Sequence, residues 1–443
     1  MGQNTTTYSY DPASNLATVT YPNGLQSSFT YDDLNRLKNV SLSRGSTLAS
    51  YSYTFDPTGN RQSAVELSGR AINWTYDGVY RLTNETISLD PRSINGSVGY
   101  GLDPVGNRLS QTSTIPGIAP GSYTYDSDDQ MLSAETYDNN GNVTVSGART
   151  FAYDFDNRLK SMNGGAVTVI YDGDGNRVAK TVSGVTTRYL VDDLNPTGHP
   201  QVVEELADGA VKRAYSYGRQ RISQNLLVNS AWTPSFYGYD GGGTVRLLTD
   251  ATGTVTDTYD YDAWGNAVNT TGSTPNSCLY RGEQYDSDLK LYYLRARYLN
   301  PLTGRFLTRD PAPGTVSVPQ TLHKYLYVGG NPVRFIDPTG HDTEEASFQM
   351  ALTSEALELG PEVTVTGSLE VSGGQAIAYV ENLSGVMRSP FAFLPALTKL
   401  AITLGAAELT VVTSFANEQL LGIAVTRYGF ITVGGYEIWS IVF

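Results

Sequence analysis

Few residues of this 443-residue chain have the types and spacing that chemistry requires. The three histidines, at positions 199, 323 and 341, lie far apart in the sequence, and Cys278 is the one cysteine. These residues predict neither a metal-ligand set nor a disulfide, and we expect no cofactor. His323 lies among tyrosine and leucine residues, so we interpret it as a hydrogen-bonded structural residue rather than a general base. The glycine-rich stretch "YDGGGT" at 239–244 lacks the lysine of a phosphate-binding loop.

Many of the aspartates belong to a repeated unit that reads Tyr-x-Tyr-Asp, four or five turn-forming residues, and then Arg-Leu or Arg-Val. The copies are commonly spaced by about 20 residues, which is typical of repeat architectures. Clear copies contain Asp32, Asp56, Asp77, Asp103, Asp154, Asp172 and Asp262, and weaker copies contain Asp11, Asp126, Asp138 and Asp240.

Each unit predicts a β-hairpin. In "SYTFDPTGNRQS" the side chains of Tyr53 and Phe55 share one face of a strand, because side chains alternate along it. Asp bonds its own downstream backbone and Gly tolerates positive φ, so the residues that follow form a turn. The next Arg can lie over a neighbouring Tyr ring or pair with the Asp of its unit. We therefore interpret these aspartates as turn residues rather than as acids that act on a substrate.

The composition fits a protein built from such hairpins. There are 31 Tyr, 13 Phe and 4 Trp with 45 Gly, as expected of half-buried strands joined by tight turns. The net charge of −14 disfavours long-range attraction to nucleic acid, and we predict no nucleic-acid partner. A local basic patch runs through the segment 281–309 and contains Arg281, Lys290, Arg295, Arg297, Arg305 and Arg309. Residues 1–30 are polar and predict no Sec-type signal peptide.

Three further stretches accompany the repeats: "YDAWGN" at 261–266, "GEQYDSDLKLYYLRARYLNPLTGRFLTRDP" at 282–311 and "LHKYLYVGGNPVRFIDPTG" at 322–340. With the Tyr-Asp units, they resemble the RHS/YD-repeat family and its RHS repeat-associated core. The resemblance implies a mainly β fold, in which repetitive antiparallel hairpins form a spiral β-sheet shell sealed by the core as a plug. In many members, which are polymorphic toxins of bacteria, a variable toxin follows.

The resemblance also sets the expected domains. We expect a YD-repeat shell at 1–269, an RHS repeat-associated core or plug at 270–340, and a smaller mixed C-terminal domain at 341–443. The composition changes at the same place, because Tyr-Asp units cease there and bases become few.

Several members of this family cut themselves near that boundary by aspartyl-protease chemistry. One carboxylate takes a proton from water, while a neutral carboxyl donates a hydrogen bond to the scissile carbonyl. By resemblance, Asp310 and Asp337 are the candidate catalytic carboxylates, and Arg305 is the candidate residue that orients or stabilises them. The expected target is the bond after Gly340 or one shortly beyond it. Both aspartates precede proline, which leaves the alternative that they are turn residues only.

Residues 341–443 carry three bases, Arg388, Lys399 and Arg427, which disfavours a nuclease. The pattern predicts a helix at 344–358 and strands at 361–381 and 421–443. The apolar stretch 390–415 contains Lys399 and Glu408, so it predicts a buried helix rather than a transmembrane one.

The functional prediction is a shell that encapsulates and delivers its own C-terminal domain as cargo, with self-cleavage near Gly340. An immunity protein and a secretion machinery are the partners that the resemblance implies. The protein would be secreted or surface-exposed by a non-Sec route, or made in the cytoplasm before export. Two alternatives are a surface scaffold that binds glycans through aromatic side chains, and a C-terminal domain that is itself a toxic enzyme or membrane-active effector.

Overall fold

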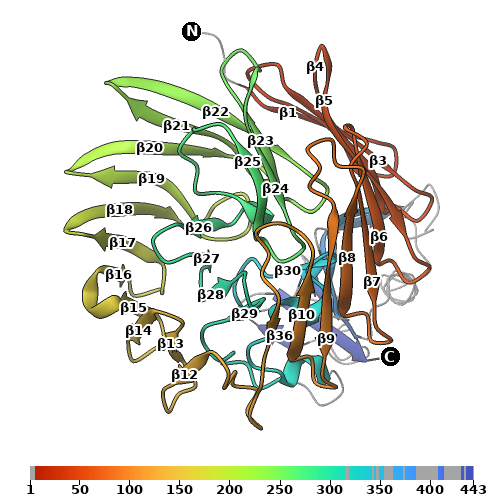
Figure 1. Ribbon diagram of the computed structural model, residues 1–443. Helices are drawn as coiled ribbons and strands as arrows, with labels where there is room; N and C mark the ends of the chain where they lie inside the picture. The colour runs from red at the N-terminus through yellow and green to blue at the C-terminus, as the bar shows by residue number, and fades with distance from the viewer. Residues whose placement is uncertain are drawn as a thin grey trace. The chain divides into compact units, whose positions relative to one another are not determined.

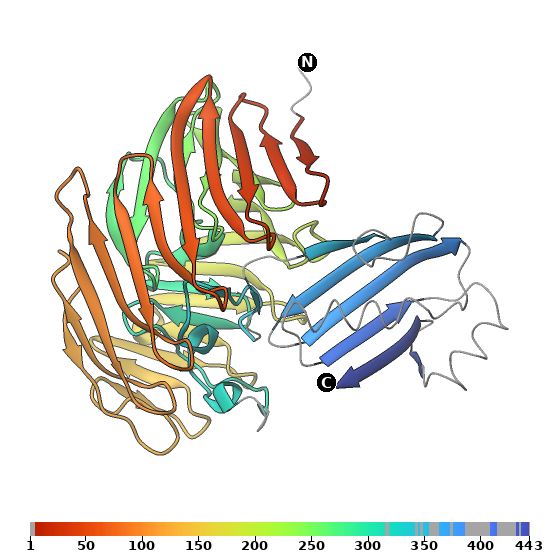
Figure 2. The same ribbon diagram turned by 90° about the vertical axis from the view of Figure 1, so that its right-hand side faces the viewer.

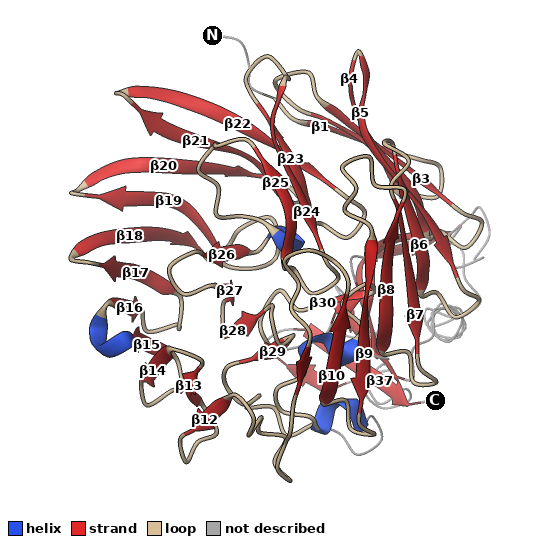
Figure 3. Cartoon of the chain, in the orientation of Figure 1, coloured by secondary structure: helices blue, strands red, loops and turns tan. Residues whose placement is uncertain are grey.

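The structure is a computed structural model, and almost all of its regular structure is strand (Figure 3). It describes residues 5–314, 319–341, 344–345, 349–353, 363–372, 375–385, 408–413, 431–433 and 436–442. The chain divides into two units, residues 1–9 with 17–342 and residues 10–16 with 343–443. The first unit contains two large sheets and the segment expected to be the plug.

The first large sheet, here called sheet A, has 11 strands in chain order, so that each strand is bonded to its neighbours in sequence (Figures 1 and 2). Its strands are β1 (Thr7–Tyr10), β2 (Leu16–Thr20), β3 (Gln26–Tyr31), β4 (Leu37–Arg44), β5 (Ser46–Phe55), β6 (Arg61–Glu66), β7 (Ala71–Tyr76), β8 (Leu82–Ser88), β9 (Gly96–Leu102), β10 (Arg108–Ser113) and β11 (Gly121–Ser122).

The second large sheet, sheet B, has 14 strands in the same serial order (Figure 1). Its strands are β12 (Glu135–Tyr137), β13 (Val143–Ser146), β14 (Arg149–Tyr153), β15 (Leu159–Met162), β16 (Val167–Tyr171), β17 (Arg177–Val182), β18 (Val185–Asp192), β19 (Gln201–Ala207), β20 (Ala210–Tyr217), β21 (Arg221–Val228), β22 (Ala231–Tyr239), β23 (Val245–Thr249), β24 (Val255–Tyr261) and β25 (Ala267–Thr271). A short 3-10 helix, η1 (Asn163–Gly165), lies between β15 and β16.

The segment after sheet B, here called the plug, has short elements only. They are η2 (Tyr280–Gly282), β26 (Gln284–Asp286), β27 (Leu291–Leu294), β28 (Arg297–Asn300), β29 (Arg305–Phe306), η3 (Pro319–Leu322), η4 (Tyr327–Gly330) and β30 (Phe335–Ile336). The strands β26 to β29 form a four-stranded antiparallel sheet.

The hairpin turns have one recurring geometry, which confirms the interpretation of the aspartates. Asp56 Oδ1 accepts the N–H groups of Thr58 at 2.9 Å and Asn60 at 2.8 Å, and Asp56 Oδ2 accepts Asn60 Nδ2 at 3.0 Å. The fourth residue of the turn has positive φ, +91° at Gly59, which explains the Gly or Asn usually found there. Where the fifth residue is arginine, it pairs with the aspartate at 2.7 Å, as at Asp32–Arg36, Asp77–Arg81 and Asp154–Arg158.

Tyrosine hydroxyls join several of the turns to the preceding one. The hydroxyl of Tyr76 donates to the Arg61 carbonyl at 2.6 Å, and that of Tyr239 donates to the Arg221 carbonyl at 2.7 Å. The same bond is made by Tyr125, Tyr153, Tyr171 and Tyr217 to Arg108, Val143, Leu159 and Val202. We call this row of bonds the tyrosine ladder. It gives the hydroxyl of these tyrosines a structural role that the Phe55 ring, which precedes Asp56, does not have.

The turn arginines point to the next repeat instead. Arg36 and Arg81 donate through Nη1 to the carbonyls of Asp56 and Asp103, at 3.0 and 2.9 Å. Other arginines lie over rings, and Arg61 is 4.7 Å from the centroid of the Tyr53 ring. Both roles expected of the arginine are therefore confirmed.

The plug packs against both sheets. Its Leu289, Leu291, Tyr293, Tyr298 and Leu307 share one buried cluster with Val143, Phe151, Leu159, Met162 and Val167 of sheet B. Its Asn331 donates to Asn60 Oδ1 of sheet A at 3.1 Å and to the Tyr80 carbonyl at 2.8 Å. The sheets also meet each other directly, since Arg246 pairs with Glu66 at 2.8 Å. A mainly β fold of repetitive antiparallel hairpins is thus confirmed.

The second unit contains a six-stranded sheet in the order β32-β33-β34-β35-β37-β36, drawn in blue in Figure 2. The strands after the plug are β31 (Glu344–Glu345), β32 (Gln349–Thr353), β33 (Val363–Ser372), β34 (Gln375–Gly385), β35 (Glu408–Thr413), β36 (Ile431–Val433) and β37 (Tyr436–Val442). Only β34 and β35 pair in parallel. The strands β33 and β34 confirm the expectation for 361–381, and β36 and β37 confirm it for the described part of 421–443, whereas residues 421–430 lie outside the described residues.

Two helices expected in this region need correction. The described parts of 344–358 are strands, because β32 pairs along its whole length with β33 and the ladder outweighs helix propensity. The end of 390–415 is also a strand, β35, which is rich in β-branched residues; residues 390–407 lie outside the described residues. In the part of the chain that the structure describes, no helix is both long and apolar enough to cross a membrane.

The tyrosine ladder can be tested with Tyr239→Phe. Tyr239 is buried, so loss of its hydroxyl leaves the Arg221 carbonyl without this donor. We expect the free energy of unfolding to fall by about 1–3 kcal/mol, measured by urea unfolding of the full chain. Tyr80→Phe is the matched control, because the Tyr80 side chain is 46% exposed and should tolerate the change. Equal effects of both variants would contradict a structural role for the ladder.

Candidate active site

Asp310 and Asp337 come together in the plug through Arg297, the first residue of β28. Arg297 Nη2 lies 2.9 Å from Asp310 Oδ2 and 3.4 Å from Asp337 Oδ2. The Arg297 guanidinium is buried and stacks 3.7 Å from the centroid of the Phe306 ring, which fixes its orientation. One guanidinium therefore serves two carboxylates that are 27 positions apart in the sequence.

The two carboxylates lie in different environments. The Asp337 side chain is 3% exposed, whereas that of Asp310 is 16% exposed. Burial raises the pKa of Asp337 to about 7, against the opposing effect of Arg297, and the negative charge of Asp310 raises it further. Asp337 can thus hold a proton near neutral pH beside a carboxylate that solvent reaches, which is the arrangement that acid–base hydrolysis needs.

The peptide group of Gly340 lies against the same residues. Arg297 Nε donates to the Gly340 carbonyl oxygen. Asp337 Oδ1 accepts the Gly340 N–H at 2.7 Å and the Thr339 hydroxyl at 3.3 Å. The carbonyl of the bond expected to be cut is therefore bound by a cation that also contacts both carboxylates.

The turn alternative also has a structural basis. Asp310 Oδ1 accepts the Ala312 N–H at 2.9 Å, and the bond from Gly340 to Asp337 closes a tight turn. Each aspartate uses Oδ1 for its turn and presents Oδ2 to Arg297, so the two roles use different oxygens.

Arg305 lies apart from this cluster. Its Nη1 donates to Asn107 Oδ1 at 2.8 Å, its Nη2 donates to the Asp129 carbonyl, and its guanidinium lies over the rings of Tyr125 and Tyr325. The orientation of β29 directs this side chain toward turns of the repeat region, so Arg297 takes the place that we expected Arg305 to hold. The sequence places Arg297 in the basic patch at 281–309. It does not indicate which arginine of that patch contacts the two aspartates.

His323 is a structural residue, as expected. Its Nδ1 accepts the N–H groups of Tyr325 and Leu326, each at 3.1 Å, and its Nε2 lies 2.9 Å from Asn107 Oδ1. Burial, together with the charge of Arg305, lowers the pKa of His323 to about 3. The imidazole is therefore neutral and fully engaged in hydrogen bonds at neutral pH.

A second carboxyl with a raised pKa lies between the two sheets. Burial, reinforced by the charge of Asp262, raises the pKa of Glu85 to about 7. Its oxygens accept Trp74 Nε1 at 2.6 Å and the Ala263 N–H at 3.2 Å. The first bond lies within sheet A, between β7 and β8, and the second joins Glu85 to the β24–β25 turn of sheet B, so we assign Glu85 a structural role.

No family model matches the chain. The chain is 37% identical over 364 residues to the tRNA3(Ser)-specific nuclease WapA of Bacillus spizizenii and, over the same length, to the tRNA nuclease WapA of Bacillus subtilis. Each match covers 77% of this chain but 15% of the relative, so the chain spans a small part of these relatives.

Among solved structures, the TcdB2-TccC3-Cdc42 complex matches with a TM-score of 0.64 and 19% identity over 76% of this chain and 19% of that chain. At this identity the match shows the fold alone, and that fold is a shell of serial hairpins. Taken with the Tyr-Asp turns, the plug and the WapA relatives, it shows that the chain belongs to the RHS/YD-repeat family, with an RHS repeat-associated core.

Proposed function

We propose that this protein is an RHS-type shell that carries the region after residue 340 as an effector and separates it by cutting the Gly340–His341 bond. The observation that supports cleavage is the position of Arg297. This residue contacts both Asp310 and Asp337, and it also donates to the Gly340 carbonyl. An enzyme-like site is thus built around a peptide of its own chain.

The chemistry is hydrolysis of one peptide bond. Asp310, which is partly exposed and pairs with Arg297, takes a proton from a water molecule whose oxygen attacks the Gly340 carbonyl carbon. Arg297 stabilises the negative charge that develops on the carbonyl oxygen. The C–N bond breaks, and the His341 nitrogen leaves as an amine after receiving a proton from the acid form of Asp337. The products are a Gly340 carboxylate and an amine at His341.

The nature of the effector is a separate proposal. The WapA relatives are named as tRNA nucleases, but this chain spans 15% of their length, and that activity is theirs. The three bases among residues 341–443 favour an effector that acts on something other than nucleic acid. An immunity protein, a secretion machinery and export by a non-Sec route would follow from an effector role.

The glycan-binding alternative has less support. A sugar-binding face requires exposed aromatic side chains, whereas the tyrosines of the ladder turn inward and donate their hydroxyls to backbone carbonyls. The second alternative, in which the C-terminal domain is itself toxic, is compatible with the shell proposal and would be tested by expressing the full chain.

Asp337→Asn tests the proposed cleavage. The amide oxygen of Asn can still accept the Gly340 N–H, while the proton donor is lost, so the fold should persist and cleavage should slow by about 100-fold or more. Mass spectrometry of the purified protein should find a fragment that corresponds to residues 341–443 in the wild type. The variant should not give this fragment.

Asp310→Asn and Arg297→Met should have the same effect, since each removes one member of the cluster. Asp126→Asn is the matched control, because Asp126 makes similar turn bonds to the N–H groups of Asp128 and Gln130, each at 2.9 Å. An intact wild-type chain, or cleavage unaffected by Asp337→Asn, would remove self-cleavage from the proposal.

The pH dependence of cleavage follows from Asp337. Its pKa is raised to about 7, so the acid form is present below that pH and is lost as the pH rises through it. We expect the cleavage rate to fall by about tenfold per pH unit above 7. The rate can be followed by gel densitometry after dilution of denatured full-length protein into buffers between about pH 6 and 9, with tryptophan fluorescence to verify refolding. A rate that rises across this range would exclude Asp337 as the acid.

A further inference from the structure

Three consecutive residues, two in the β27–β28 turn and Arg297 at the start of β28, bind three consecutive carbonyls of the segment 338–340. Arg295 Nη1 donates to the Pro338 carbonyl, the Ala296 N–H donates to the Thr339 carbonyl at 3.1 Å, and Arg297 Nε donates to the Gly340 carbonyl. The two segments therefore run together in a single register up to the bond proposed to be cut.

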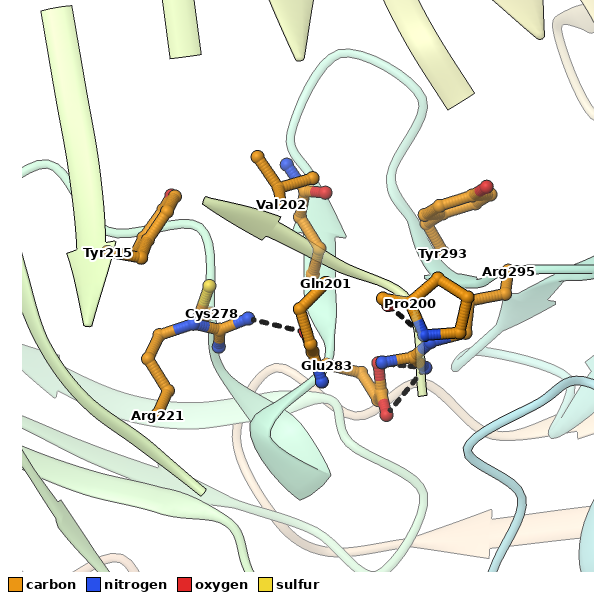
Figure 4. A pocket seen from close by; sticks show the side chains of 10 residues that line it. Pro200, Gln201, Val202, Tyr215, Arg221, Cys278, Glu283, Tyr293 and Arg295 are labelled. Atoms are coloured by element: carbon orange, nitrogen blue, oxygen red, sulfur yellow. Dashed lines mark hydrogen bonds and ion pairs between the residues drawn. The ribbon is translucent and has the colours of Figure 1, made fainter. Parts of the chain in front are cut away.

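Arg295 is itself held in place from outside this turn. Its Nη1 pairs with both carboxylate oxygens of Glu283, Oε1 at 3.1 Å and Oε2 at 3.0 Å (Figure 4). Its Nε donates to the Pro200 carbonyl at 3.0 Å. Pro200 belongs to the β18–β19 loop of sheet B, and Glu283 follows η2. These half-buried neighbours, which also line the pocket in Figure 4, thus fix the direction in which Arg295 donates to Pro338.

The turn accepts only glycine at position 340. Gly340 has φ +77°, and a Cβ placed on it would lie 2.2 Å from the Leu294 carbonyl oxygen and 2.9 Å from the Arg297 nitrogen. Backbone cannot move aside as a flexible side chain can. If the segment 338–340 shifted by one residue, Thr339 or His341 would occupy the position of Gly340. Both residues have a Cβ, for which this position has no room.

We propose that Leu294–Arg297 is a register clamp, which selects the Gly340–His341 bond and keeps the new Gly340 carboxylate in the site after cleavage. The inference rests on the proposed self-cleavage and adds its specificity and its outcome. Arg295 is a positioning residue, because it binds the Pro338 carbonyl and does not contact the reacting atoms of the Gly340–His341 bond.

Retention follows from the charge that hydrolysis creates. Water supplies OH to the Gly340 carbonyl carbon and hydrogen to the His341 nitrogen, so a neutral amide becomes a carboxylate and an amine. The bond from Arg297 to Gly340 then becomes charge-assisted, and such bonds are roughly twice as strong as neutral ones. The shell-side end stays in the site, the fragment that begins at His341 separates, and each chain cuts once.

The clamp can be tested in the full-length chain with two variants. Arg295→Met removes the charged donor, and Arg295→Lys keeps one. The readout is the first residue of the released fragment, by intact mass, together with the cleavage rate after refolding. Wild type should release a fragment that begins at His341. Arg295→Met should cut about tenfold more slowly or more and give several first residues; Arg295→Lys should restore the single start.

Arg149→Met is the matched control, because it removes another arginine bond to a plug carbonyl, that of Leu289 at 2.8 Å. The fragment released by this variant should still begin at His341.

Retention of the new Gly340 carboxylate is tested with carboxypeptidase. The wild-type shell fragment should keep Gly340, whereas that of Arg295→Met should be trimmed. Single-site cleavage at the wild-type rate in Arg295→Met, or rapid trimming of the wild type, would overturn the clamp.

An uncut wild-type chain would refute self-cleavage, and the clamp would then be judged on the uncut chain by hydrogen exchange. Peptides that cover 294–297 and 337–340 should be protected in the wild type and should exchange faster in Arg295→Met, because the Ala296 N–H loses its fixed acceptor. Equal exchange in both proteins would refute the clamp as well.

Discussion

The structure depends on hydrogen bonds that join one turn to the next at the edge of the sheets. A hairpin turn leaves backbone carbonyls that its own strands do not pair, and burying them alone is unfavourable. Here the tyrosines of several units donate back to the preceding turn, and Arg36 and Arg81 donate forward to the following one. A single hairpin would be marginal, whereas a series satisfies its polar groups and buries one continuous face.

Stacking of this kind makes long sheets, but it leaves their inner faces to be covered. The plug does this with side chains that are both apolar and charged. Its aliphatic and tyrosine residues complete the core against sheet B, and Asp286 pairs with Arg177 of that sheet at 3.0 Å with both side chains 1% exposed. Because a buried charge is unfavourable without its partner, such pairs tie the plug to one position against the repeats.

The same constraint produces the candidate site. Arg297 is buried by the plug, and a buried guanidinium requires acceptors in several directions. The fold supplies two carboxylates and the Gly340 carbonyl, so the contacts that satisfy one cation also bring together the groups on which the proposed cleavage rests. Asp337 and Asp310 differ in burial, with side chains 3% and 16% exposed.

Local features of the fold were already determined by the sequence. Asp bonds within a five-residue turn, a left-handed fourth residue and alternation along strands act over short distances, so the repeat of hairpins and the turn role of the aspartates could be predicted. The pairing of Asp310 with Asp337 came from resemblance to a family. Which arginine joins them was decided by the tertiary structure, because Arg297 and Arg305 lie on adjacent short strands that direct their side chains to different neighbours. The strands β32 (349–353) and β35 (408–413) were missed for a related reason: their pairing partners are distant in sequence, and strand pairing outweighs local propensity.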